Sequence, residues 1–234
     1  MVSLPAMFFA PFVILYGILL FLLLGVVFLL LQIGVINYAF TAIGLSPNEA
    51  LLALLTSLIG SYINIPLTRI ESGETHPATI VNSFGIPYRL PMRYAGDGYT
   101  TVAINLGGAI VPILVSLYVL HAQPSVIAPA IAGVVIVSAV VHRCARAVPG
   151  MGIATPMFVP PIVAALAAWF LASFFATPHI DAIAYVSGTL GTLIGADILN
   201  LRRIGELGAP VASIGGAGTF DGVFLTGIVA VLLA

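Results

Sequence analysis

The chain has no lysine and few charged residues of any kind. Charged residues make up 6% of its 234 residues and hydrophobic residues 61%, whereas a soluble domain carries about 25% charged residues. So few charges cannot cover the surface of a water-soluble fold of this size. The composition therefore predicts an integral membrane protein in contact with membrane lipid. The cations, all arginines, form no basic stripe, so we expect no nucleic-acid partner.

Cysteine is nearly absent as well. A single cysteine, Cys144, excludes an internal disulfide and a cysteine metal cluster. The sequence contains no Gly-x-Ser-x-Gly, His-Glu-x-x-His or phosphate-binding loop, and we expect neither a metal nor a cofactor. The longest polar stretch, residues 67–98, is too short for a separate domain. We therefore expect a single transmembrane domain over residues 1–234. Its N-terminus lacks the positive region of a signal peptide and is expected to form the first span.

Seven apolar segments are long enough to cross a membrane as helices, for which about 20 residues are needed. The sequence Ser46-Pro47-Asn48-Glu49 predicts a capping box at the start of the second helix, and Thr177-Pro178 predicts a similar start for the sixth. We expect an all-α polytopic membrane protein. Its predicted helices cover residues 8–31, 46–66, 99–120, 125–141, 160–175, 177–201 and 209–233.

The arginines fall in three of the connections between these helices. They are Arg69, Arg89 and Arg93, then Arg143 and Arg146, then Arg202 and Arg203. With seven alternating spans, all three connections lie on one side of the membrane. Because cytoplasmic loops carry an excess of arginine and lysine, the pattern predicts a cytoplasmic N-terminus and a C-terminus on the outer side.

The cytoplasmic loop 67–98 contains two short β-prone runs on either side of Gly85-Ile86-Pro87. This pattern predicts a β-hairpin over residues 78–92, with a simple ordered connector as the alternative. Because two-stranded hairpins are marginally stable alone, this one would need to pack against the bundle. It would also offer an edge to an extended peptide.

Two aspartates, Asp197 and Asp221, lie inside the last two predicted helices, in the helix hairpin 178–234. A charged side chain near the bilayer centre costs on the order of 3 kcal/mol, so such residues usually face a bundle interior and are functional candidates. Asn200 lies three residues after Asp197 and shares its helix face. Structural hydrogen bonds to neighbouring polar side chains are the alternative role for each aspartate.

Glycine is dense around the second aspartate, at Gly215, Gly216, Gly218 and Gly222. The pattern indicates either a loosened, partly unwound stretch beside Asp221 or close helix packing through small residues. At 1.5 Å per residue, Asp197 lies roughly 8 Å from the arginine end and Asp221 roughly 17 Å deep. The two carboxylates can meet only if residues 205–215 depart from a straight helix. A second pair, Gly191 and Gly195, is predicted to pack against a neighbouring helix.

If the two carboxylates meet, their chemistry follows from electrostatics. Two close carboxylates in a low dielectric cannot both ionise, so one keeps a proton. The ionised partner can take a proton from a bound water, while the protonated one donates to a carbonyl oxygen. Aspartic proteases use this arrangement, which needs no metal.

The segment Gly216-Ala-Gly218-Thr-Phe-Asp221-Gly222, together with Asp197, resembles the GxGD-type intramembrane aspartyl proteases, which include presenilin, signal peptide peptidase and the prepilin peptidases. The likeness implies that Asp197 and Asp221 are the catalytic pair, with Gly218 beside them. The chain departs from that family where Phe220 replaces the glycine before the second aspartate and Ala196 replaces a tyrosine. Most of the chain is also similar to a family of prokaryotic membrane proteins of unknown function, most strongly from Gly188 to Ala234.

These observations predict an intramembrane aspartyl protease in a prokaryotic cell membrane. Its substrate would be a transmembrane or juxtamembrane peptide. Asn200 and the glycines at 215, 216, 218 and 222 would support the catalytic pair. A small proton- or cation-coupled transporter or channel using the same aspartates is the first alternative. A membrane scaffold without catalytic activity is the second.

Overall fold

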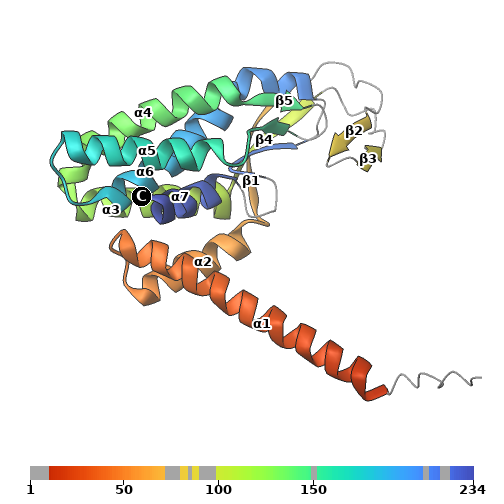
Figure 1. Cartoon of the computed structure of the whole chain (residues 1–234). Helices are drawn as coiled ribbons and strands as arrows, with labels where there is room; N and C mark the ends of the chain where they lie inside the picture. Colours follow the sequence, from red (N-terminus) through yellow and green to blue (C-terminus); the bar gives the residue numbers. More distant parts are fainter. Residues whose placement is uncertain are drawn as a thin grey trace, which may run out of the picture.

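A computed structural model describes residues 11–71, 80–83, 86–89, 99–148, 152–207, 211–216 and 222–234. Within these ranges the chain is mostly helical (Figure 1). The α-helices are α1 (Pro11–Ala42), α2 (Pro47–Gly60), α3 (Val111–Ala122), α4 (Ile127–Cys144), α5 (Val159–Phe174), α6 (Ile180–Thr192) and α7 (Gly222–Leu233). Shorter helical turns adjoin them: the π-helical η1 (Leu106–Ile110) and η3 (Leu193–Asp197), and the 3₁₀ turns η2 (Pro124–Val126) and η4 (Ile198–Leu207).

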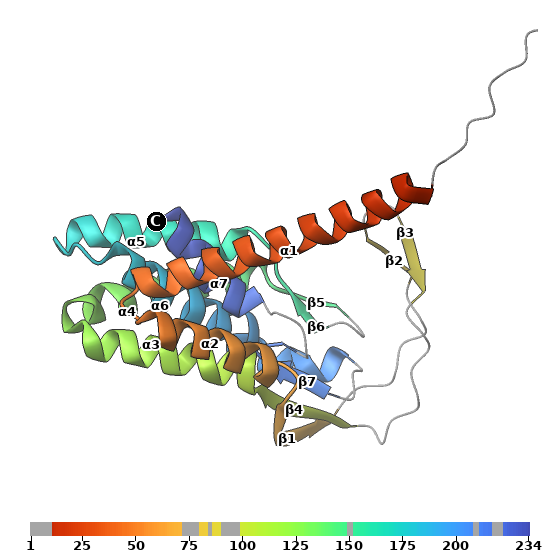
Figure 2. The same cartoon turned by 90° about the horizontal axis from the view of Figure 1, so that it is seen from below.

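Helix α6 is the centre of a bundle that α3, α4, α5 and α7 surround (Figures 1 and 2). Nearly every residue of α6 is buried, including the aromatic side chain of Tyr185. Close approach to α4 depends on glycine, because a Cβ at Gly191 would lie 2.6 Å from Val137 Cβ and one at Gly195 would lie 2.6 Å from Ser138 O. The prediction that these two glycines pack against a neighbouring helix is therefore confirmed.

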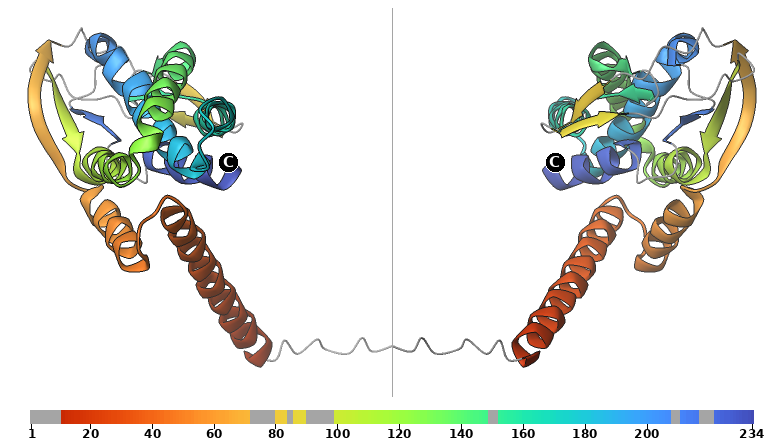
Figure 3. Two further views of the ribbon diagram at one scale, coloured as in Figure 1. Left: turned by 90° about the vertical axis from the view of Figure 1, so that its left-hand side faces the viewer. Right: turned by 90° about the vertical axis from the view of Figure 1, so that its right-hand side faces the viewer.

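Three helical stretches are long and apolar enough to cross a membrane: Gly17–Ala42, Pro124–Cys144 and Ile180–Ile204. They indicate an integral membrane protein. Helix α1 contacts the rest of the molecule at its C-terminal end, where Phe40 is buried against Tyr185 and Phe224. Most of α1 projects away from the bundle with its apolar side chains exposed (Figure 3), as expected for a helix surrounded by lipid.

A three-stranded sheet caps one end of the bundle, and the all-α prediction is wrong there. Strand β1 (Asn64–Glu71) pairs antiparallel with β4 (Tyr99–Asn105), and β7 (Val211–Ile214) pairs parallel with β4. These strands occupy the end of the predicted helix 46–66 and the beginnings of 99–120 and 209–233. The resulting helices α2 and α7 have 14 and 12 residues, or roughly 21 and 18 Å, against a hydrocarbon core of about 30 Å.

Two smaller sheets are hairpins. The predicted hairpin is confirmed as β2 (Ile80–Ser83) paired antiparallel with β3 (Ile86–Arg89). The second hairpin, in which β5 (Arg146–Val148) pairs antiparallel with β6 (Gly152–Ala154) between α4 and α5, was not predicted.

The predicted capping box at the start of α2 is also confirmed. Ser46 donates its backbone N–H to Glu49 Oε2 at 2.8 Å and its hydroxyl to the same atom at 2.7 Å. The hydroxyl oxygen accepts the backbone N–H of Glu49 at 3.4 Å. The hydrogen bonds from the Ser46 backbone and hydroxyl lower the pKa of the exposed Glu49 carboxyl. These bonds satisfy backbone groups that the first turn of a helix leaves open.

The close contact between α4 and α6 generates a stability prediction. We expect Gly191→Ala to destabilise the protein by about 1–3 kcal/mol, because the added methyl overlaps Val137 in a packed interface. Gly25→Ala in α1 is the matched control, since a Cβ there meets nothing within 4 Å, and alanine favours the helix. Unfolding of both variants in detergent measures the difference. Equal stabilities would contradict the packing assigned to Gly191.

Candidate functional site

Asp197 lies where the central helix loses its regular geometry. It is the last residue of the π-helical turn η3, after which the chain continues as the 3₁₀ turn η4. Its side chain is half-buried, and Oδ2 accepts the backbone N–H of Gly215 at 2.8 Å. The structure thus brings together two predicted site residues that are 18 positions apart. π-Helical turns are frequent at functional sites.

The glycines on the other side of this hydrogen bond are required by the backbone. Gly215 and Gly216 have φ angles of +79° and +89°, in the left-handed region that other residues rarely adopt. A Cβ on Gly215 would lie 2.6 Å from Ala109 Cβ. Gly215 and Gly216 therefore lie in a non-helical backbone, as the interpretation of a loosened stretch predicts, and Gly215 packs closely against η1. Residues 211–214 form a strand, which confirms that this segment is no straight helix.

Two of the predicted site residues, Asp221 and Gly218, lie outside the described residues. Gly222, the first residue of α7, is exposed. The separation of the Asp197 and Asp221 carboxylates therefore stays a prediction.

The side chain of Asn200 hydrogen-bonds to backbone carbonyl groups that precede it in the chain. Its side chain is fully buried, and Nδ2 donates to the carbonyl oxygens of Gly195 at 2.9 Å and Ala196 at 3.0 Å. Arg203 donates to Asn200 Oδ1 at 3.5 Å. Carbonyl groups at a helix end otherwise lack partners, so Asn200 holds the turn that carries Asp197. We classify it as a positioning residue.

A second polar cluster lies at the junction of the sheet and the bundle. Asn105 is buried; its Nδ2 donates to Ser61 O at 2.7 Å and to Asn64 Oδ1 at 3.0 Å, and its Oδ1 accepts the N–H of Gly108 at 2.7 Å. Ser213 on β7 donates its hydroxyl to Asn64 Oδ1 at 2.5 Å. This cluster ties all three strands to the ends of α2 and η1.

This Asn105 cluster reaches Asp197 through backbone packing. Gly108 accepts no side chain, because a Cβ there would overlap the carbonyl oxygen of Gly215. Gly215 in turn donates to Asp197. Sequence inspection can identify buried asparagines in an apolar chain, but Ser213 and Gly108 carry no distinguishing signal. The cluster fixes the position of the backbone that binds Asp197.

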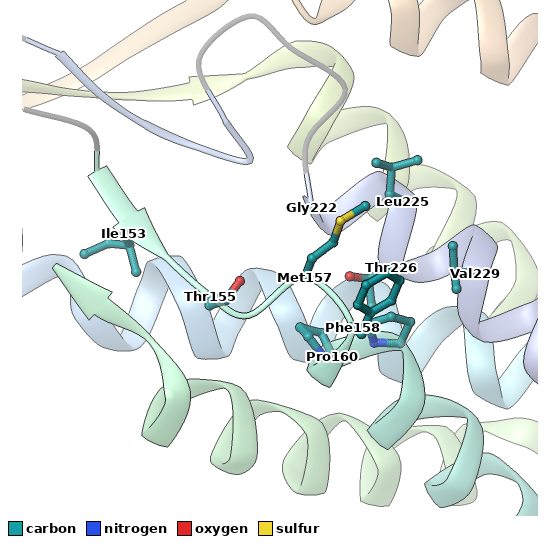
Figure 4. A pocket seen from close by; sticks show the side chains of 10 residues that line it. Ile153, Thr155, Met157, Phe158, Pro160, Gly222, Leu225, Thr226 and Val229 are labelled. Atoms are coloured by element: carbon teal, nitrogen blue, oxygen red, sulfur yellow. The ribbon is translucent and has the colours of Figure 1, made fainter. Parts of the chain in front are cut away.

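An apolar cavity of about 390 Å³ opens beside the start of α7. Its walls come from the connection after β6, the start of α5 and the first two turns of α7 (Figure 4). Met157 and Phe158 lie near Gly222 and Thr226 in this view. The lining residues are Ile153, Thr155, Met157, Phe158, Pro160, Pro161, Gly222, Leu225, Thr226 and Val229. The cavity has room for an apolar side chain. One of its lining residues is Gly222, which follows Asp221 in the sequence.

The described residues contain no cluster of side chains suited to binding a metal ion. Among them, no group of three or more His, Cys, Asp or Glu side chains could hold a metal ion.

Comparison with known proteins gives one match. The model of a family described as "Protein of unknown function (DUF1614)" matches residues 58–233, which include the sheet, the bundle and both aspartates but not α1. No curated protein and no solved structure matches the chain.

The Asn105 cluster makes a prediction about stability. Asn105→Ala would leave the buried Gly108 N–H and Ser61 carbonyl without their side-chain partner. We expect a loss of about 1–3 kcal/mol, measured by unfolding in detergent. Asn48→Ala, at an exposed position in the first turn of α2, is the control and should cost much less. If the two variants unfold alike, the cluster is not what joins the sheet to the bundle.

Proposed function

The chain belongs to the DUF1614 family of proteins of unknown function, and from its geometry we propose that it is an intramembrane aspartyl protease. Asp197 and Asp221 would form the catalytic pair. The substrate would be a transmembrane or juxtamembrane peptide. No metal or cofactor takes part in the proposed reaction.

The observation that carries this proposal is the hydrogen bond between Gly215 N–H and Asp197 Oδ2. This bond joins Asp197 to the segment that precedes Asp221 in the sequence. Residues 215 and 221 are six positions apart, so the chain between them spans roughly 20 Å at most. This bond supports the pairing of the two carboxylates, because it limits how far Asp221 can lie from Asp197.

The proposed reaction uses the two carboxylates in opposite protonation states. The ionised carboxylate takes a proton from water as the water oxygen bonds to the peptide carbonyl carbon, and the protonated carboxyl donates its proton to the carbonyl oxygen. The C–N bond then breaks as one carboxyl donates a proton to the leaving nitrogen and the other carboxylate takes a proton from a hydroxyl of the tetrahedral intermediate, which restores the starting protonation states.

Gly215 and Gly216 would contribute to the proposed site because they have no side chains. Gly215 is buried against Ala109 and holds the backbone beside Asp197 in place, whereas the half-buried Gly216, with its positive φ angle, would leave backbone without a covering Cβ. An extended peptide needs such backbone access, because cleavage requires its carbonyl carbon to lie close to the attacking water.

A transporter is the second candidate, and the interrupted geometry of the central helix favours it. The passage from α6 through the π-helical η3 into the 3₁₀ η4 at Asp197 is of the kind that forms ion sites in transporters. Proton or cation flux into liposomes that requires Asp197 would favour this candidate over proteolysis.

The decisive test replaces each aspartate by asparagine in the full chain. Asp197→Asn keeps an oxygen that can accept the Gly215 N–H, so we expect the fold to persist while proton transfer is lost. Cleavage of a library of membrane-spanning peptides in liposomes should fall at least about 100-fold in Asp197→Asn and in Asp221→Asn.

Asp181→Asn is the matched control. Asp181 lies in the first turn of the same helix, roughly 24 Å along its axis from Asp197. It should cleave like the unmodified chain. Cleavage that persists in both catalytic variants would disprove the proposed function.

A further inference from the structure

Four exposed arginines gather where two parallel helices end. Arg143 lies in the last turn of α4 and Arg146 in β5, while Arg202 and Arg203 lie in η4 after α6. All four side chains are exposed. Figure 1 shows these elements at the sheet end of the bundle. We name these four residues the arginine patch.

The two halves of the patch lie side by side because their elements are packed together. Helices α4 and α6 approach closely at Gly191 and Gly195. Beyond the helix ends, η4 contacts both β5 and β6, and Ala147 packs against the hydrophobic cluster that contains Ile204. The patch is therefore a fixed feature of the fold rather than a chance meeting of loops.

Among the side chains that the structure describes, which do not include that of Glu206, none supplies the patch with an anionic partner. Arg203 donates to the neutral Asn200 Oδ1 at 3.5 Å, and no described carboxylate pairs with any of the four guanidinium groups. The C-terminal end of α4 offsets only a part of the charge, at Arg143. Four cations held on neighbouring elements repel one another, so the arrangement favours binding of an external anion.

The depth of the patch identifies that anion. The stretch Pro124–Cys144 has 21 residues, or roughly 31 Å, which matches a hydrocarbon core of about 30 Å. Arg143 and Arg146 then lie at the level of the lipid headgroups, and Arg202 and Arg203 beside them. A guanidinium group binds phosphate oxygens through paired hydrogen bonds.

We propose that the arginine patch binds the phosphate headgroup of an anionic phospholipid. A zwitterionic lipid also carries a phosphate, but its own cation cancels the charge. The described residues at the opposite end of the bundle include His121, His179 and Asp181 but no arginine, so the preference is confined to one membrane face. The proposal does not depend on proteolysis.

The test measures lipid retention by native mass spectrometry of the full chain in neutral detergent. The protein is offered phosphatidylglycerol and phosphatidylcholine in equal amounts. Unmodified protein should retain phosphatidylglycerol preferentially. Each double variant, R143Q/R146Q and R202Q/R203Q, should lower this preference about 25-fold, given the contribution of an arginine near an anionic membrane surface.

The matched control is R69Q/R89Q, which removes the same charge from strands β1 and β3 and should keep the preference. If a double variant fails to fold, its single variants replace it, each with an expected loss of about fivefold. Equal losses in the control and the patch variants would show a diffuse charge effect and overturn the proposal. An unchanged preference in the patch variants, or displacement of the lipid by equimolar inorganic phosphate, would also overturn it.

Discussion

The hydrogen bond from Gly215 to Asp197 joins two segments that depart from regular structure. On one side, α6 passes through a π-helical turn into a 3₁₀ turn; on the other, β7 ends in two left-handed glycines. A half-buried carboxylate in an apolar molecule needs a hydrogen-bond donor, since an unpaired charge in a low dielectric is expensive. The backbone N–H of Gly215 supplies it. Each irregular segment therefore stabilises the other.

The packing around this bond makes it a rigid contact. Gly108 and Gly215 meet backbone to backbone, and the buried Asn105 side chain accepts the backbone N–H of Gly108. Ser57 donates its hydroxyl to the neighbouring Gly107 carbonyl at 2.7 Å. Side chains cannot enter such a junction, and its polar groups are satisfied by one another. A site built in this way would hold a carboxylate in a constant position, which preorganised catalysis requires.

How much the sequence predicts depends on whether the signal is local. The capping box at 46–49, the hairpin around 80–89 and the packing of Gly191 and Gly195 all follow from short patterns, and all are present. Strands β4 and β7 and the first residues of β1 fall in stretches that the sequence predicts as helix, because a short apolar run next to a longer one cannot be told from helix by periodicity alone. The partner of Asp197 had no signal at all, because a backbone N–H is common to every residue except proline.

The helix assignment also explains why the two aspartates looked mismatched in depth. That mismatch, roughly 8 Å against 17 Å, came from extending a straight helix back to residue 209. Residues 211–214 are instead a strand parallel to β4, and α7 begins at Gly222. Depth cannot be counted along a helix through a strand and a left-handed turn. Gly215, six residues before Asp221, donates its backbone N–H to Asp197. The length of this six-residue segment therefore limits the separation of the two aspartates, and unequal depth no longer argues against a catalytic pair.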